Sequence, residues 1–262
     1  MTKLLLTLAL LSAVGCYEGG GGGCPGCGGG IDWSKHPFVQ ALSLPGSGEG
    51  GKLNVGFLVV DGVYNTELTA PMDIFHHTVF HDDVGMSVFT VGPSLAPVTS
   101  FEGLRLLPDY TWTDHPPVDV LVVPSAEHSM DTDLENQAMI AWVAETAPRA
   151  RAVMSLCDGA FVLAGAGLLD GQDVTTFPAD RARLREMFPE VIVHDEVSFV
   201  HDSKLITSEG GARSFEPALY LCEILYGKQA ADGIAAGMVI DWNLPAVPHL
   251  TTPQTVEAAS GE

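Results

Sequence analysis

Short segments of almost uninterrupted apolar residues alternate along this chain with stretches of helical periodicity. The apolar segments are residues 54–60, 86–91, 118–123 and 152–156, and they are rich in Val, Leu and Phe. Strands that are apolar on both faces are typical of parallel sheets, because helices cover such sheets on either side. The alternation therefore predicts an α/β fold in which helices connect parallel strands.

The helical stretches complete the predicted fold. Apolar residues recur at helical spacing in six ranges, namely 71–81, 134–147, 159–169, 179–188, 215–226 and 230–240. With the strands they predict a three-layer α/β/α sandwich, flavodoxin-like in outline, with a mostly parallel sheet. Ligands of such sheets bind beyond the carboxyl ends of the strands, so we expect the functional residues in the loops that follow them.

Charge and composition exclude several classes of protein. The chain has 262 residues, of which 46% are hydrophobic, as in globular domains. Thirty-three acidic and 12 basic residues give a net charge of −21, which repels phosphate backbones, so we expect no nucleic-acid partner. No apolar segment reaches the roughly 18 residues that a membrane-spanning helix needs.

The first 15 residues have the features of a secretory signal peptide. Lys3 supplies the positive charge, and residues 4–14 form an apolar segment too short to span a bilayer. The sequence Ala13-Val14-Gly15-Cys16 resembles the lipobox of bacterial lipoproteins, which implies that Cys16 is lipidated and anchors the protein in the cell envelope. An ordinary signal peptide or a short buried segment is the alternative.

A glycine-rich segment follows, and we interpret residues 16–53 as a flexible tether. Cys24 and Cys27 lie within it as a C-x-x-C pair, for which a small local disulfide is expected after export, with a redox or metal role as the alternative. The folded domain is predicted at residues 54–250, and residues 251–262 are predicted to be a polar tail. Helical spacing places Cys222 in the core.

One strand runs directly into a helix with a cysteine at the junction. Ser155, Cys157 and Gly159 form an S-x-C-x-G arrangement, in which small residues two positions before and after the cysteine allow the strand and the helix to approach. A cysteine exposed on such a sharp turn is a candidate nucleophile. Because it would lie at a helix N-terminus, we expect its pKa below the ordinary value. A buried structural cysteine is the alternative.

Several segments together resemble the ThiJ/PfpI family, a branch of the class I glutamine-amidotransferase-like superfamily. They are SLCDGAFVLAGAGLLDG (155–171), GFLVV (56–60), TELTAPMDIF (66–75), residues 173–178, and KLITSEGGARSFEPAL (204–219). The resemblance covers roughly residues 54–245. It implies the same α/β fold, with 173–178 and 204–219 as the segments that close the sheet, and it implies a homodimer.

The resemblance also implies roles for individual residues. In the family an acidic residue hydrogen-bonds the nucleophilic cysteine, and Glu67 stands at the matching position before Cys157. One of two like-charged neighbours then keeps a proton, so Glu67 is predicted to act as a general acid and base. The alternative for Glu67 is a solvated first-turn acid of the helix predicted at residues 71–81.

An oxyanion site is implied as well. Its donors would be the backbone N–H of Asp158, next to Gly159, and that of Ser125 or Ala126. His128 lies in the same loop and is a candidate pocket residue, although a solvent-exposed histidine is the simpler interpretation.

Two departures from the family bear on the activity. Asp158 follows the cysteine where protease-like relatives have histidine, and Phe177 stands where others have the histidine of a Thr-Thr-His-Trp segment. A hydrolase triad is therefore not evident. The resemblance points to an isonitrile-hydratase type of activity on a small electrophile, with Cys157, Glu67 and Asp158 as catalytic residues and no cofactor.

The alternative function is non-catalytic. The same resemblance extends to the sensor domains of AraC-type regulators, which implies small-ligand binding or oxidant sensing through Cys157. Few residues follow Ile240, so we expect no DNA-binding module. His77, His81 and Asp73 recur at helical spacing, which we interpret as a solvated helix face rather than a metal site.

Overall fold

The computed structural model describes residues 36–81 and 85–252. The predicted signal peptide, Cys16, Cys24 and Cys27 lie outside the described residues, as does the tail from residue 253 onward. No helix within the described ranges is both long and apolar enough to cross a bilayer.

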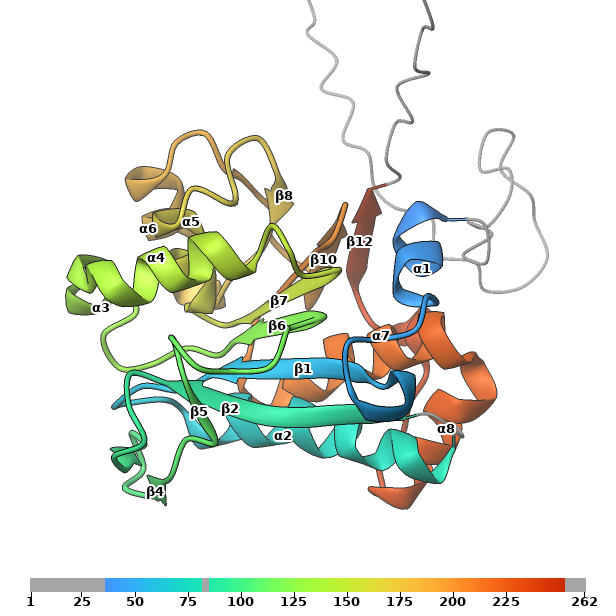
Figure 1. Cartoon of the computed structure of the whole chain (residues 1–262). Helices are drawn as coiled ribbons and strands as arrows, with labels where there is room; N and C mark the ends of the chain where they lie inside the picture. The colour runs from blue at the N-terminus through green and yellow to red at the C-terminus, as the bar shows by residue number, and fades with distance from the viewer. Residues whose placement is uncertain (1–35, 82–84, 253–262) are drawn as a thin grey trace, which may run out of the picture. The chain divides into compact units, whose positions relative to one another are not determined.

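The centre of the described domain is an eight-stranded sheet with the order β12-β10-β11-β7-β6-β1-β2-β5 (Figure 1). Its strands are β1 (Leu53–Leu58), β2 (Met86–Gly92), β5 (Tyr110–Thr111), β6 (Val120–Val123), β7 (Ala152–Leu156), β10 (Phe199–Asp202), β11 (Leu205–Ser208) and β12 (His249–Thr252). All neighbours are parallel except β10 and β11, which are antiparallel. The predicted mostly parallel sheet is confirmed.

Helices cover both faces of this sheet (Figure 1). They are α1 (Pro37–Leu42), α2 (Asn65–His77), α3 (Thr132–Glu135), α4 (Gln137–Thr146), α5 (Gly159–Gly165), α6 (Arg181–Met187), α7 (Phe215–Tyr226) and α8 (Lys228–Gly237). One apolar core packs α1, α2, α7 and α8 against one face, and a second packs α4, α5 and α6 against the other. Strands between two cores must be apolar on both faces, as the sequence pattern indicated.

Short elements connect the layers. They are β3 (Val98–Thr99), β4 (Arg105–Leu106), β8 (Asp173–Val174), β9 (Ile192–Val193) and the 3₁₀ helices Glu49–Gly51, Thr78–Phe80, Pro178–Asp180, Gly211–Ser214 and Leu244–Ala246. β8 pairs only with β9, in a separate two-stranded sheet. The expectation that residues 173–178 help to close the main sheet was therefore wrong, whereas β11 within 204–219 does pair with β7.

The ordered fold begins earlier than the predicted boundary at residue 54. Phe38, Val39 and Leu42 of α1 are buried in the core, so the described part of the predicted tether is folded rather than free coil. Arg151 holds the following turn, because its guanidinium donates to the carbonyls of Leu44 (2.8 Å) and Pro45 (2.7 Å). The glycine and proline residues within 45–51 indicated a flexible segment. The hydrogen bonds from Arg151 that hold this segment span more than 100 residues and have no local sequence signal.

The predicted tail also begins too early. Thr251 and Thr252 belong to β12, which pairs in parallel with β10 through Thr251 opposite His201. β12 has the sequence HLTT, which lacks the continuous apolar pattern by which the central strands were recognised.

We expect Arg151→Met to loosen the segment that precedes β1. The variant loses the bonds to Leu44 and Pro45 and the ion pair with Asp119 (3.0 Å), and it leaves that buried carboxylate without its cation. Urea unfolding should show a loss of roughly 2–4 kcal/mol. Limited proteolysis should cut between residues 36 and 52.

Arg149→Met is the matched control for this experiment. The side chain of Arg149 is exposed and makes no hydrogen bond or ion pair with the described residues, and its backbone N–H, which donates to Thr146, is unaffected by the substitution. Equal stability and equal protease resistance of the Arg151→Met and Arg149→Met variants would contradict the proposed clamp.

Candidate active site

Four chain segments meet beyond the carboxyl ends of neighbouring parallel strands. The first turn of α2 follows β1, Ser125 follows β6, Cys157 follows β7, and the turn Gly210–Gly211 follows β11. Because these strands run in the same direction, their ends lie at one edge of the sheet. The predicted location of the functional residues is therefore the place where these side chains converge.

Cys157 occupies the sharp turn between β7 and α5. Its φ of 52° lies in the left-handed region, which is strained for a residue with a side chain. Gly159 permits the turn, because a Cβ there would lie 2.1 Å from the carbonyl oxygen of Val123. The sequence pattern predicted this close approach of strand and helix.

A second glycine packs directly against the cysteine. Gly210 has a φ of +78°, and a Cβ at this position would lie 2.3 Å from the Cβ of Cys157. The N–H of Cys157 donates to the carbonyl of Ser208 at 3.0 Å, which fixes the same pair of segments. Only glycine fits at position 210, because any side chain there would collide with Cys157.

Glu67 lies beside Cys157 because α2 begins at Asn65 and not at Pro71. Pro71 is inside the helix, although the sequence favoured it as the first helical residue. Glu67 is only 4% exposed, so it is not a solvated acid. Its Oε2 accepts the N–H of Ser125 and its Oε1 accepts the N–H of Gly211, each at 3.1 Å, and the carboxyl also hydrogen-bonds the thiol of Cys157.

Both members of this pair have a raised pKa. Burial raises the pKa of Glu67, and the N–H groups of Gly211 and Ser125 offset part of this effect. Burial also raises the pKa of Cys157, and the negative charges of Glu67 and Asp158 raise it further. A buried carboxylate and thiolate in contact cannot both be charged at low cost, so the pair retains a proton at neutral pH.

The expectation of a lowered pKa for Cys157 was therefore wrong. The N–H of Asp158 at the start of α5 does favour the thiolate, as predicted from the helix terminus. Its effect is smaller than that of burial, since Cys157 is only 7% exposed, and smaller than that of the two neighbouring carboxylates. The burial of the sulfur, which has the largest effect on its pKa, was not visible in the sequence.

Asp158 is a buried acid next to the cysteine. It is 8% exposed, and its Oδ1 accepts the hydroxyl of Thr176 at 3.1 Å. Burial raises the pKa of Asp158 to about 7, and the charge of Asp180 together with a hydrogen bond to that carboxyl contributes. Asp158 therefore exchanges a proton within the physiological pH range.

The expected oxyanion donors are engaged in other bonds. The N–H of Ser125 donates to Glu67, and the N–H of Ala126 donates to the hydroxyl of Ser129 at 2.8 Å. His128 is exposed and pairs with Asp131 at 3.3 Å, and this contact does not involve the groups around Cys157. Of the proposed donors, only the N–H of Asp158 reaches the sulfur.

Tyr64 is a further member of the site that the sequence did not reveal. Burial raises the pKa of its phenol, and the charges of Cys157 and Glu67 raise it further. The ring packs against Phe101, with centroids 4.7 Å apart. Nothing in the local sequence distinguishes this tyrosine, which immediately precedes α2.

The site is acidic. The charged groups that act most strongly on Cys157, Glu67 and Asp158 are carboxylates, including Glu102 and Asp180. Hollows of about 550 and 370 Å³ occur elsewhere, and neither is lined by Cys157. Within residues 36–81 and 85–252, no three His, Cys, Asp or Glu side chains are arranged to hold a metal ion.

Comparison with known proteins identifies the family. The sequence pattern of the DJ-1/PfpI family matches residues 54–223. Isonitrile hydratase of Pseudomonas putida is 35% identical over 179 residues, which cover 68% of this chain and 75% of that protein. The chain belongs to the DJ-1/PfpI family. The resemblance expected from the sequence is thereby confirmed.

Solved structures similar to this DJ-1/PfpI domain share its fold. A ThiJ/PfpI family protein from Pseudomonas syringae superposes with a TM-score of 0.66 at 25% identity, covering 76% of this chain and 78% of that chain. An AraC family transcriptional regulator from Pseudomonas putida gives a TM-score of 0.62 at 22% identity, covering 71% and 99%. Both support the α/β sandwich with a mostly parallel sheet.

Asp158 should make the stability of this DJ-1/PfpI domain depend on pH. Its pKa is raised to about 7 in the folded state, whereas an unfolded aspartate titrates near about 4. The folded state therefore binds the proton more tightly, and this contribution is complete below about pH 4 and is lost as the pH rises through 7. Between pH 4 and pH 8 the free energy of unfolding should therefore decrease more in the parent protein than in Asp158→Asn, and the difference should be roughly 2–4 kcal/mol.

Urea unfolding at several pH values measures this difference. The exposed Asp170→Asn serves as the control, because it removes a carboxylate without changing the site. Parallel pH profiles for the parent protein and Asp158→Asn would exclude a raised pKa for this acid.

Proposed function

We propose that this protein is a cysteine-dependent enzyme that hydrates a small, uncharged electrophile, in the manner of an isonitrile hydratase. The observation that carries the proposal is the buried Glu67 carboxyl, which hydrogen-bonds the Cys157 thiol and is held by two backbone N–H groups. The 35% identity to isonitrile hydratase of Pseudomonas putida supports this choice of chemistry.

The first step joins the cysteine to the substrate. Sγ of Cys157 attacks the terminal carbon of an isonitrile, R–N≡C, while the thiol proton passes through the Glu67 carboxyl to that same carbon. A C–S bond forms, and the product of the step is a thioimidate, R–N=CH–S–Cys157. Because the pair starts with the proton, no external acid is required.

The second step adds water and releases the product. A water oxygen bonds to the thioimidate carbon, and a proton reaches the nitrogen. Asp158 suits this transfer, because a pKa of about 7 lets it give a proton to nitrogen and take one from water at neutral pH. The C–S bond then breaks, Cys157 recovers its proton through Glu67, and R–NH–CHO leaves. The overall reaction converts R–N≡C and H₂O into R–NH–CHO, and Cys157, Glu67 and Asp158 return to their starting states.

The charge of the site and the burial of its sulfur favour this class of substrate. Carboxylates repel an anionic substrate, whereas an isonitrile has no net charge. Cys157 is only 7% exposed, so a slender terminal group reaches the sulfur more readily than a branched carbonyl carbon.

The proposal places the enzyme in the bacterial cell envelope. Its support is the Ala13-Val14-Gly15-Cys16 sequence after an apolar segment, which is typical of lipoprotein signals. The lipid chain on Cys16 would be the only contact with the membrane. Homodimerisation, expected from the family resemblance, stays a prediction that light scattering on the purified protein can test.

Turnover of a small alkyl isonitrile tests the catalytic proposal. Cys157→Ser should lower kcat/KM by at least about 10³-fold because the nucleophile is lost, and Glu67→Gln by about 10²–10⁴-fold because the proton relay is lost. Cys222→Ala is the control, since this core cysteine lies in α7. Formamide can be measured by chromatography, and undiminished turnover by Cys157→Ser would refute the mechanism.

Cell fractionation tests the proposed anchor. Full-length protein expressed in a bacterium should sediment with membranes and be extracted by detergent, whereas Cys16→Ala should lose the lipid and this behaviour. Cys24→Ala, which changes a cysteine outside the lipobox, should behave like the parent protein. Equal membrane association of the parent and Cys16→Ala would rule out lipidation at this residue.

A further inference from the structure

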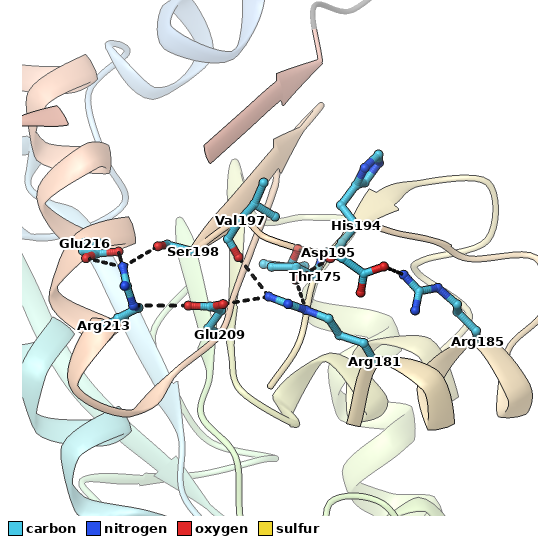
Figure 2. A network of polar contacts seen from close by, with 11 residues as sticks. Thr175, Arg181, Arg185, His194, Asp195, Val197, Ser198, Glu209, Arg213 and Glu216 are labelled. Atoms are coloured by element: carbon cyan, nitrogen blue, oxygen red, sulfur yellow. Dashed lines mark hydrogen bonds and ion pairs between the residues drawn. The ribbon is translucent and has the colours of Figure 1, made fainter. Parts of the chain in front are cut away.

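A buried arginine connects α6 to the loop behind the cysteine. Arg181 is 7% exposed, and its Nη2 donates to the Oε1 of Glu209 at 2.8 Å and to the carbonyl of Val197 at 3.0 Å (Figure 2). Its Nε donates to the Thr175 hydroxyl at 3.1 Å. The guanidinium is therefore fixed by three partners from different segments.

Glu209 is fixed from the opposite side as well. Its Oε2 pairs with the Nε of Arg213 at 3.3 Å (Figure 2). Its backbone N–H donates to the carbonyl of Ser198 at 2.8 Å. Arg213 in turn contacts the Ser198 hydroxyl at 2.7 Å and Glu216 at 3.1 Å. Side chain and backbone of Glu209 are thus both immobilised just before the turn that follows.

That turn forms part of the active site. Gly210 and Gly211 have φ values of +78° and +56°, a conformation that glycine adopts without strain. Because glycine has many other accessible backbone conformations, the turn needs further contacts to hold this one. Gly210 packs against Cys157, and the N–H of Gly211 donates to Oε1 of Glu67. A displacement of the turn by one ångström would break that 3.1 Å bond.

We propose that Arg181 is a positioning residue for the catalytic pair: through Glu209 it fixes the Gly210–Gly211 turn, and thereby the N–H that holds the Glu67 carboxyl beside Cys157. The inference rests on the proposed function in that it explains how the acid of that mechanism is held. Arg181 touches neither Glu67 nor Cys157 in any of its hydrogen bonds, so its action is indirect.

Arginine suits this task better than a simple cation. Its planar fork reaches Thr175, Val197 and Glu209 simultaneously, whereas an ammonium group presents one point of charge. A buried ion pair adds little to stability by itself, because desolvation offsets the attraction. The ion pair between Arg181 and Glu209 instead holds the glycine turn in one geometry.

The experiment measures the titration of Glu67 directly. Other groups that act on Glu67 are Cys157, Glu102, Asp158 and Tyr64, and none of them is changed in the test variants. Protein labelled with ¹³C at the glutamate carboxyl carbon is titrated by NMR, and the Glu67 signal is assigned from its absence in Glu67→Gln. The variants are Arg181→Met, Arg181→Lys and Glu209→Gln.

Loss of the anchor should raise the pKa of Glu67. The Gly211 N–H stabilises the charged carboxylate, so weakening this bond in Arg181→Met or Glu209→Gln should move the midpoint up by about 0.5–1 pH unit. Arg181→Lys should fall between these variants and the parent, and the double variant Arg181→Met/Glu209→Gln should add little. Glu209→Gln conserves volume, so it gives an answer even if Arg181→Met does not fold.

Arg185→Met is the matched control. Arg185 lies in the same helix and pairs with Asp195 at 2.7 Å (Figure 2). Its side chain is partly buried and also donates to the carbonyl of Val193, and neither Arg185 nor Asp195 hydrogen-bonds the glycine turn. An unchanged Glu67 midpoint in Arg181→Met and Glu209→Gln, or the same shift in Arg185→Met, would overturn the inference. Failure of the parent protein to hydrate isonitriles would instead refute the proposed function while leaving this titration interpretable.

Discussion

The carboxyl of Glu67 is the contact on which the arrangement of the site depends. It joins the start of α2 to Ser125 and to Gly211, which are 58 and 144 residues away in the sequence. Each oxygen accepts one backbone N–H, and the carboxyl also hydrogen-bonds the sulfur. A single buried side chain therefore determines the distance between three loops, and the parallel sheet supplies the edge at which those loops can meet.

This arrangement has an electrostatic cost that shapes its chemistry. A thiol and two carboxyls lie buried together, and each has a raised pKa. Such a cluster stores protons rather than negative charge. It suits a reaction in which an uncharged substrate must receive protons on carbon and nitrogen, and it is poorly suited to binding anions. The buried Arg181 does not favour ionisation of these acids, because its own charge is matched by Glu209.

The sequence predicted the parts of the structure that have local signals. The range of β7 and that of α7 were predicted exactly as observed, and the small residues around Cys157 indicated the sharp turn. The position of Glu67 came from the family resemblance, since the residues alone favoured a helix beginning at Pro71. The contact between Arg181 and Glu209 bridges 28 residues without any periodic pattern, so only the folded chain reveals it. The pKa of Cys157 was predicted in the wrong direction because the helix terminus is visible in the sequence and burial is not.

The backbone at Cys157 carries an implication of its own. A φ of 52° is a conformation that glycine or asparagine adopts more readily than cysteine does. The sulfur is thus held against the local conformational preference of the chain, and a sequence optimised for thermal resistance alone would tend to discard it. A design method that optimises only the free energy of folding would therefore favour replacing Cys157 by glycine or asparagine, and the nucleophile would be lost although the stability increased.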